Sequence, residues 1–267
     1  MVLRGRRADA SPVGRVSRRA VLWGPVSALT GCSLPSSLPL PDRGSDAGSC
    51  RSPESLESFT TLAGAPLISE TSGAPARLRA DPRFIPLLEA WAADWAELSG
   101  LGPITGVRNY GAFVDKCDSW HAAGRAFDIA AIEHEQGSVS CRVDQWGPGT
   151  AEQLRGYWRL AASTHLHFAY VLTSLFDDAH RNHIHIDNGV SGFEGPVTFN
   201  EGSRVQVQVV QATLRHVFGV TLDYTGSYDA QTRDALRGIQ ADLGITAPLR
   251  EPEGWSAYLR AAAGRTG

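Results

Sequence analysis

The segment His183-Ile184-His185-Ile186-Asp187 constrains the fold of this chain more than any other, because its polar and apolar residues alternate strictly. A period of two is typical of a β-strand with one buried face. The two histidines and the aspartate then share one face, while the two isoleucines point to the other. The sequence therefore predicts a half-buried strand that presents two imidazoles side by side.

A second strand is predicted over residues 126–132, an apolar run that contains one charge, Asp128. A buried carboxylate is costly unless something compensates for it, and a metal ion would do so. His121 precedes Asp128, and Gly124 between them allows a turn that brings both side chains toward one point. Two His and one Asp, with an open position for water, form a recognised ligand set for catalytic zinc. Each residue alone also has an ordinary structural explanation, so only the combination favours a metal site.

The remaining patterns predict an α+β domain over residues 65–190. Asp81-Pro82 is typical of a helix start, and Gly100 of a helix end. Apolar residues at helical spacing predict helices over residues 84–98, 152–162 and 165–176. A further strand is predicted over residues 104–108. Strands and helices in irregular order favour a mostly antiparallel sheet with flanking helices.

Two motifs carry a resemblance to a known group. The stretch Ser119 to Asp128, S-x-H-x-x-G-x-A-x-D in form, resembles the first zinc motif of the D-Ala-D-Ala metallopeptidases, which share their fold with the hedgehog signalling domain. Residues 179–187 are similar to the end of the bacterial extensin-like C-terminal domain family within that group. The resemblance covers roughly residues 65–190.

The resemblance implies a role for individual residues. His121, Asp128 and His185 are expected to bind Zn2+. Arg108 resembles the arginine that stabilises the substrate carbonyl or carboxylate, and Ser119 is expected to contact the substrate.

The general base departs from the pattern of many members of the group. They place Glu or Asp three residues before the last His ligand, where this chain has Asn182, which cannot take a proton. Another branch of the group uses a His two residues before the ligand, and here that residue is His183. We therefore expect His183 to be the catalytic base, with His180, Asp187 and Glu133 as the alternatives.

Residues 1–32 resemble an export signal. Ser17-Arg18-Arg19-Ala20-Val21-Leu22 is a twin-arginine pattern, followed by an apolar run that is far shorter than the ~20 residues needed to cross a bilayer. Leu29-Thr30-Gly31-Cys32 resembles a lipobox, which implies acylation of Cys32. A disordered basic leader with a chance Cys is the alternative. We expect an exported protein, anchored by lipid to the outer face of a bacterial membrane, with residues 33–64 as a disordered Ser/Pro-rich spacer.

Three other cysteines remain, and an oxidising compartment favours one disulfide among them. Cys117 and Cys141 both lie in the predicted domain and flank the first motif, so they are the predicted pair. Cys50 is then left unpaired. A thiol metal site is the rival interpretation, but the chain has no C-x-x-C spacing to support it.

Beyond a Gly-rich linker at residues 191–203, residues 204–263 predict a small bundle of three helices. Asp229 is the expected N-cap of the second helix. The residues that stand out are Val207, Val210, Gln211, Leu214, Gly226, Tyr228 and Thr232. Their pattern resembles a peptidoglycan-binding domain of the three-helix type, and an ordinary helical domain is the alternative.

These observations lead to one expected function and two rivals. A net charge of -3 argues against nucleic-acid binding. The resemblances imply peptidoglycan as a partner, and the lipobox implies a membrane. The expected activity is zinc-dependent hydrolysis of amide bonds in peptidoglycan peptides, as a D-amino-acid-linked endopeptidase or carboxypeptidase, in cell-wall remodelling. The first rival is a non-catalytic, wall-anchored binding protein that keeps the zinc-site fold. The second is a peptidase with other substrates.

Overall fold

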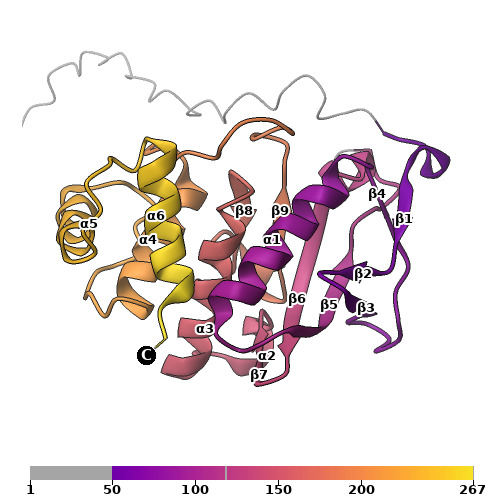
Figure 1. The fold of residues 1–267 in the computed structure, drawn as a ribbon, viewed down its shortest axis with the longest axis horizontal. Helices are drawn as coiled ribbons and strands as arrows, with labels where there is room; N and C mark the ends of the chain where they lie inside the picture. Colours follow the sequence, from indigo (N-terminus) through magenta and orange to yellow (C-terminus); the bar gives the residue numbers. More distant parts are fainter. Residues whose placement is uncertain (1–49, 118, 267) are drawn as a thin grey trace, which may run out of the picture. The chain divides into compact units, whose positions relative to one another are not determined.

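The computed structural model describes residues 50–117 and 119–266, which belong to one compact unit (Figure 1). The strands are β1 (Glu57–Phe59), β2 (Thr61–Leu62), β3 (Ala65–Ser69), β4 (Leu78–Ala80), β5 (Ile104–Gly111), β6 (Ala126–His134), β7 (Gly137–Ser140), β8 (Tyr170–Leu172) and β9 (Ile184–Asp187). The helices are α1 (Phe84–Ser99), α2 (Val143–Trp146), α3 (Ala151–Thr164), α4 (Arg204–His216), α5 (Ala230–Asp242) and α6 (Pro252–Gly264). Three 3-10 helices are η1 (Pro53–Ser55), η2 (Trp120–Ala123) and η3 (Asp178–Arg181).

Among the described residues, seven strands form the main sheet, in the order β2-β3-β5-β6-β9-β8, with β7 also paired to β6. The β3–β5 pair is parallel, and the other pairs of this sheet are antiparallel. A separate antiparallel pair joins β1 to β4. The predicted α+β class with a mostly antiparallel sheet is confirmed.

Strand β6 lies at the centre of the sheet, between β5 and β9. Its apolar run explains this place, because a strand with both faces covered cannot alternate with polar residues. Phe127, Ile129 and Ile132 are fully buried. The strand predicted over residues 126–132 is therefore confirmed, and it brings Asp128 into the middle of the fold.

Helices α1 and α3 pack against each other, and Figure 1 shows α1 running in front of the sheet. The indole Nε1 of Trp91 in α1 donates a hydrogen bond of 3.1 Å to Ser163 Oγ in α3. Gly100 ends α1 as predicted, at φ 67°, a left-handed conformation that suits glycine. Helix α3 begins with a capping box between Thr150 and Gln153.

The C-terminal helices share one hydrophobic core with α1 and α3. Val207, Val210 and Leu214 of α4 are fully buried. The buried Arg159 of α3 donates hydrogen bonds to the carbonyl of Ala263 in α6 and, through the same guanidinium, to that of Ser99 at the end of α1. The three predicted helices are present, and they pack as part of the described unit.

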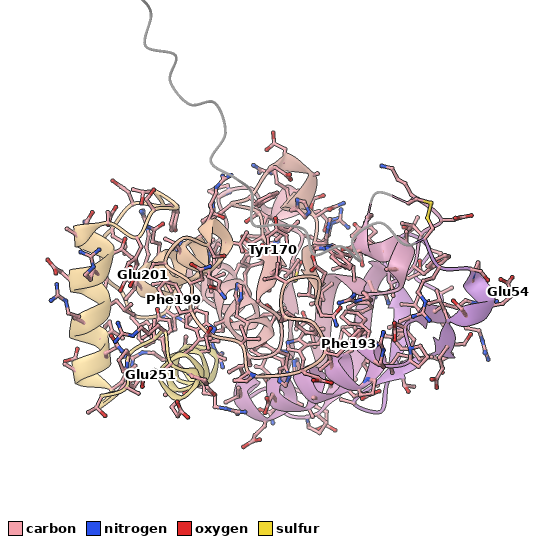
Figure 2. The ribbon with its side chains drawn as sticks, turned by 90° about the horizontal axis from the view of Figure 1, so that it is seen from above. Glu54, Tyr170, Phe193, Phe199, Glu201 and Glu251 are labelled. Carbon is pink, nitrogen blue, oxygen red and sulfur yellow. A yellow bond between two sulfur atoms is a disulfide. The ribbon has the colours of Figure 1, made fainter. Side chains whose placement is uncertain are left out.

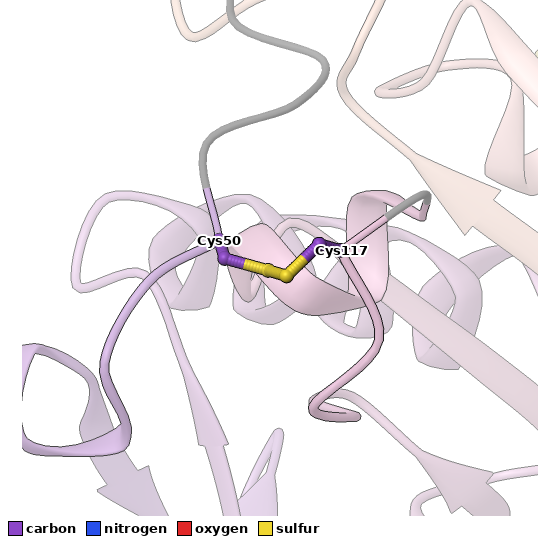
Figure 3. The surroundings of a disulfide bond; sticks show 2 residues. All are labelled: Cys50 and Cys117. Carbon is purple, nitrogen blue, oxygen red and sulfur yellow. A yellow bond between two sulfur atoms is a disulfide. The ribbon is translucent and has the colours of Figure 1, made fainter.

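The predicted disulfide between Cys117 and Cys141 is wrong. The structure joins Cys50 to Cys117, with the Cα atoms 5.0 Å apart (Figure 3). Cys141 follows β7 and is a buried free thiol. Its backbone N–H bonds to Ala130 of β6, and this pairing directs the residue into the core, away from the loop of Cys117. A disulfide indicates an oxidising compartment and thus an exported protein.

Two other expectations are corrected. The spacer predicted over residues 33–64 does not extend through its described part, because η1, β1 and β2 lie within residues 50–64. These short elements are stabilised by distant partners, Leu78–Ala80 for β1 and the start of β3 for β2. The predicted helix at residues 165–176 is a turn followed by β8, which pairs with the edge of β9.

The lipobox with Cys32 and the twin-arginine pattern lie outside the described residues. None of the helices that the structure describes combines the length and the apolar character needed to cross a membrane.

Candidate metal centre

The 3-10 helix η2 positions the first predicted ligand, His121. Ser119 caps this helix, and its hydroxyl accepts a hydrogen bond from the His121 backbone N–H at 3.3 Å. Gly124 ends it at φ 65°. A Cβ on Gly124 would lie 2.8 Å from the backbone nitrogen of Asp81, so only glycine fits this turn. Ser119 is thus placed one turn from the site, where it shapes the loop that carries His121.

The pairing of β6 with β9 positions the other two predicted ligands. Asp128 lies directly opposite His185, and residues directly opposite each other in an antiparallel pair have neighbouring side chains. Asp128 also pairs with Gly111 of β5. Strands β5, β6 and β9 are therefore adjacent at the position of Asp128.

The three predicted ligands converge on one point. His185 Nδ1 lies 2.9 Å from Asp128 Oδ1, and His121 Nε2 lies 3.2 Å from the same oxygen. The two ring nitrogens are themselves 3.2 Å apart. Among the described residues, His121, Asp128 and His185 form a group whose ligand atoms all lie within 4.8 Å of one another.

The hydrogen bonds on the far side of each ring determine which nitrogen carries the proton. His121 Nδ1 lies 3.2 Å from the carbonyl oxygen of Ala112, which can only accept, so Nδ1 donates. His185 Nε2 lies 3.1 Å from Asp187 Oδ2 and donates to it. In the neutral rings, the remaining nitrogens turn lone pairs toward each other and toward a carboxylate oxygen. Such an arrangement needs a positive charge at its centre, either a proton or a metal ion, and an N, N, O donor set suits zinc.

The electrostatics of the group are consistent with a bound cation. Burial alone would raise the pKa of Asp128, but hydrogen bonds from His121 and His185 hold it far below its usual range. Burial alone would lower the pKa of His185, but hydrogen bonds to Asp128 and Asp187 raise it to about 9. A proton on His185 is therefore the charge that a metal ion would replace.

His183 lies beside the three ligands. Its Nε2 is 3.5 Å from Asp128 Oδ1, and its Nδ1 is 2.6 Å from Asn182 Oδ1. The rings of Tyr110 and His180 pack against it, at centroid distances of 5.9 Å and 5.1 Å. Burial lowers the pKa of His183 to about 4, although the nearby Asp128 carboxylate acts in the opposite direction. The ring is thus neutral near pH 7, and one of its nitrogens carries no proton.

Arg108 is held by two carboxylates. Its Nε lies 2.5 Å from Glu133 Oε1, and another guanidinium nitrogen lies 3.7 Å from Glu70 Oε2. The hydrogen bond to Glu133 raises the pKa of Arg108 despite its partial burial. Glu133 is thereby an ion-pair partner, which makes it a poor alternative as the base. The structure does not bring the Arg108 guanidinium into contact with the three ligands.

Sequence reasoning missed the residues that orient the ligands. Asp187 is almost fully buried and binds His185, and its other oxygen accepts the Gly189 backbone N–H at 2.8 Å. The two-residue spacing of His185 and Asp187 on one strand face was the available signal. The Ala112 carbonyl left no signal, because a backbone oxygen is not visible in a sequence pattern.

Comparison with known proteins covers the part of the chain that holds the site. No curated protein and no solved structure matches the chain. Residues 107–194 match the family described as "Extensin-like protein C-terminus". This range includes all three converging ligands together with Tyr110, Asn182 and His183. The segment that carries the candidate metal centre is therefore an extensin-like one.

Proposed function

We propose that this chain is an exported zinc peptidase that hydrolyses amide bonds in peptidoglycan peptides. One observation carries the proposal. His121 Nε2, His185 Nδ1 and Asp128 Oδ1 converge on one point, within 3.2 Å of one another, as two nitrogen ligands and one oxygen ligand of zinc would.

Each residue of the site then has a task. His121, Asp128 and His185 would hold Zn2+, which lowers the pKa of bound water to about 7 and polarises a carbonyl group. His183 accepts a proton at Nε2 from the attacking water and returns it to the leaving amine. Asp187 keeps the His185 ring in the tautomer that leaves Nδ1 free.

The substrate class rests on several independent features. The two motifs resemble those of the D-Ala-D-Ala metallopeptidases, and the C-terminal pattern resembles that of a peptidoglycan-binding domain. The disulfide indicates an exported protein. Peptidoglycan is a polymer that an exported bacterial protein can reach. Acylation of Cys32 would hold the protein on the outer face of the membrane. Loss of membrane association in Cys32→Ser would support this anchor, and unchanged detergent partitioning would contradict it.

A wall-anchored binding protein without turnover is the rival function, and Asn182 at the position of the usual acidic base favours it. The extensin-like description names no substrate, so a peptidase of other substrates is a second rival. Digestion of purified sacculi separates these functions, because only the proposed enzyme releases soluble peptide fragments. The mass spectra of those fragments identify the bond that is cut.

The variants His185→Ala and His183→Ala test the roles of the two histidines. His185→Ala removes a ligand and should lose both zinc and activity. His183→Ala should keep about one zinc per chain, while turnover falls by roughly 10²–10⁴-fold. His216→Ala, at the end of α4, is the matched control and should retain both. Loss of zinc from His183→Ala together with its retention in His185→Ala would reverse the assignment.

A further inference from the structure

The side chain of Asn182 contacts the ring of His183. Its Oδ1 lies 2.6 Å from His183 Nδ1. The ring of Tyr110, near the end of β5, packs its edge against the same imidazole, with the ring centroids 5.9 Å apart. Asn182 thus contacts His183 at the position where the sequence departs from the acidic residue of related peptidases.

An amide oxygen can only accept hydrogen bonds, so the contact with Asn182 Oδ1 requires a proton on His183 Nδ1. A neutral imidazole carries one N–H, and Nε2 is then left with its lone pair. That lone pair is turned toward the metal centre, 3.5 Å from Asp128 Oδ1. Without Asn182, the opposite tautomer would gain a hydrogen bond from Nε2–H to the Asp128 carboxylate, and the ring could no longer accept a proton there.

The direction of the Asn182 amide decides the tautomer. A reversed amide would present NH2 to His183 Nδ1 and demand the wrong tautomer. The Tyr110 ring packs its edge against His183, and the guanidinium carbon of Arg142 lies 6.0 Å from the Tyr110 ring centroid. Tyr110 therefore supports the His183 ring from strand β5.

We propose that Asn182 is a positioning residue that holds His183 as the Nδ1–H tautomer, with Tyr110 packed against the edge of the ring. From the sequence, Asn182 is only a residue that cannot take a proton, whereas its contact gives it a role through His183. The effect on turnover rests on the proposed function, but the tautomer itself does not.

The test is the tautomer of His183, measured by two-bond ¹H–¹⁵N correlation spectra of ¹⁵N-histidine-labelled full-length protein, with and without zinc, at neutral pH. Comparison with His183→Gln assigns the ring among the eight histidines of the chain. The wild type should show Nδ1–H, and Asn182→Ala should shift to Nε2–H. Asn182→Asp keeps an acceptor and should restore Nδ1–H. Asp178→Asn, an exposed change in the same loop, is the matched control and should behave as the wild type.

Turnover on sacculi gives the second readout. Asn182→Ala should lower kcat by about 10–100-fold, the range typical of partners that orient a catalytic group, with KM and zinc content little changed. Asn182→Asp should recover part of the loss, and Tyr110→Phe should lose less than Asn182→Ala. The proposal is overturned if wild-type His183 is Nε2–H, or if Asn182→Ala retains Nδ1–H. Absence of fragment release by every protein would instead overturn the proposed function, and the spectra would still decide the tautomer.

Discussion

Short motifs mark both the sheet centre and the C-terminal helices in the sequence. The two regions differ in whether the fold itself uses all the polar atoms of the motif residues. At the sheet centre, His121, His183 and His185 each use one ring nitrogen for a fixed hydrogen bond. The other nitrogen of each ring faces Asp128. The capacity to bind a further group is concentrated at one point.

In the C-terminal helices, the corresponding motif residue is Gln211 of α4. Its amide nitrogen donates to Thr225 Oγ1, to the Ser227 carbonyl and to Thr232 Oγ1, and its oxygen accepts the Gly226 N–H. Each polar atom of this side chain is therefore used within the fold. Gln211 ties the turn before α5 to α4, and the motif in this region describes packing.

A motif therefore indicates chemistry when its polar groups remain available after the fold has formed. A motif whose groups are fully paired indicates only that the fold needs them. Figure 2 separates the two regions in space, with Phe199, Glu201 and Glu251 marking the C-terminal helices and the disulfide at the side that carries Glu54. Variants in each region should therefore differ in whether they affect metal and activity or only stability.

The largest effect is expected from Asp128→Asn, which removes the one carboxylate that faces both ligand nitrogens. Zinc should be lost, and activity should fall by about 10³-fold or more, because several kcal/mol of charge stabilisation disappear. The circular dichroism spectrum should be unchanged. Zinc per chain is measured by inductively coupled plasma mass spectrometry, and full retention of one zinc would contradict the assignment.

Removal of the disulfide by Cys50→Ser should have the second-largest effect, and this effect is on the free energy of unfolding. The bond closes a loop with a sequence separation of 67 residues, for which the chain-entropy estimate is about 4 kcal/mol. Urea unfolding measures the change, with Cys141→Ala as the control that keeps the bond. Peptide mapping without reduction should find Cys50 linked to Cys117, and a peptide that contains Cys141 in its place would refute the pairing.

Acidification should weaken the junction between the two regions through His165, which is fully buried and packs against Trp255 of α6. Burial lowers its pKa from 6.5 to about 4, despite a hydrogen bond with the Phe168 carbonyl. The unfolded chain therefore binds a proton that the folded chain does not, and stability falls as the pH drops from about 6.5 to 4. The loss is roughly 3 kcal/mol. The variant His165→Phe should flatten this part of the pH profile of the unfolding free energy, and an unchanged slope would exclude His165 as its source.

Gln211→Leu should have the smallest effect, and one confined to stability. Loss of its hydrogen bonds leaves the buried hydroxyl of Thr232 unpaired and should cost about 2 kcal/mol in urea unfolding. Zinc content and activity at 25 °C should be unchanged, as in the control Gln231→Leu, which alters an exposed residue of α5. A fall in activity of the folded variant would mean that the two regions are coupled.

The fragment 204–263 gives a further test of the comparison. The sequence predicts that it folds alone and binds sacculi. In the structure, α4 is buried along most of its length, in part against α3. We therefore expect the isolated fragment to have little helix by circular dichroism. A helical fragment that co-sediments with sacculi would restore it as an independent wall-binding domain.

The sequence predicted the sheet centre well because its signals are local. Alternation in His183–Asp187 and the apolar run around Asp128 each indicate a strand without information from elsewhere in the chain. The prediction that the first of these strands is half-buried was wrong, because all four residues of β9 are buried. His121 could be joined to them because Gly124 marks a turn within the same motif. These residues were correctly predicted to lie together.

The predictions that were wrong concern residues whose structure depends on long-range contacts. Residues Tyr170–Leu172 have apolar spacing that fits a helix or a strand, and only pairing with β9 decides between them. Pairing of Cys50 with Cys117 depends on the return of the first described residues to the loop before η2, which no local pattern records. The role of Asn182 was missed because an amide has no basicity, while its hydrogen bonds become visible only in three dimensions.

The disulfide also affects how far the candidate metal centre can lie from a membrane anchor at Cys32. Arg51, next to Cys50, donates its backbone N–H to the carbonyl of Ala122 in the turn that carries His121. The first described residues therefore lie beside the turn that carries a candidate metal ligand. If Cys32 is acylated as proposed, the 17 residues between it and Cys50 can span at most about 60 Å. Only the layer of cell wall within that distance of the bilayer would be accessible.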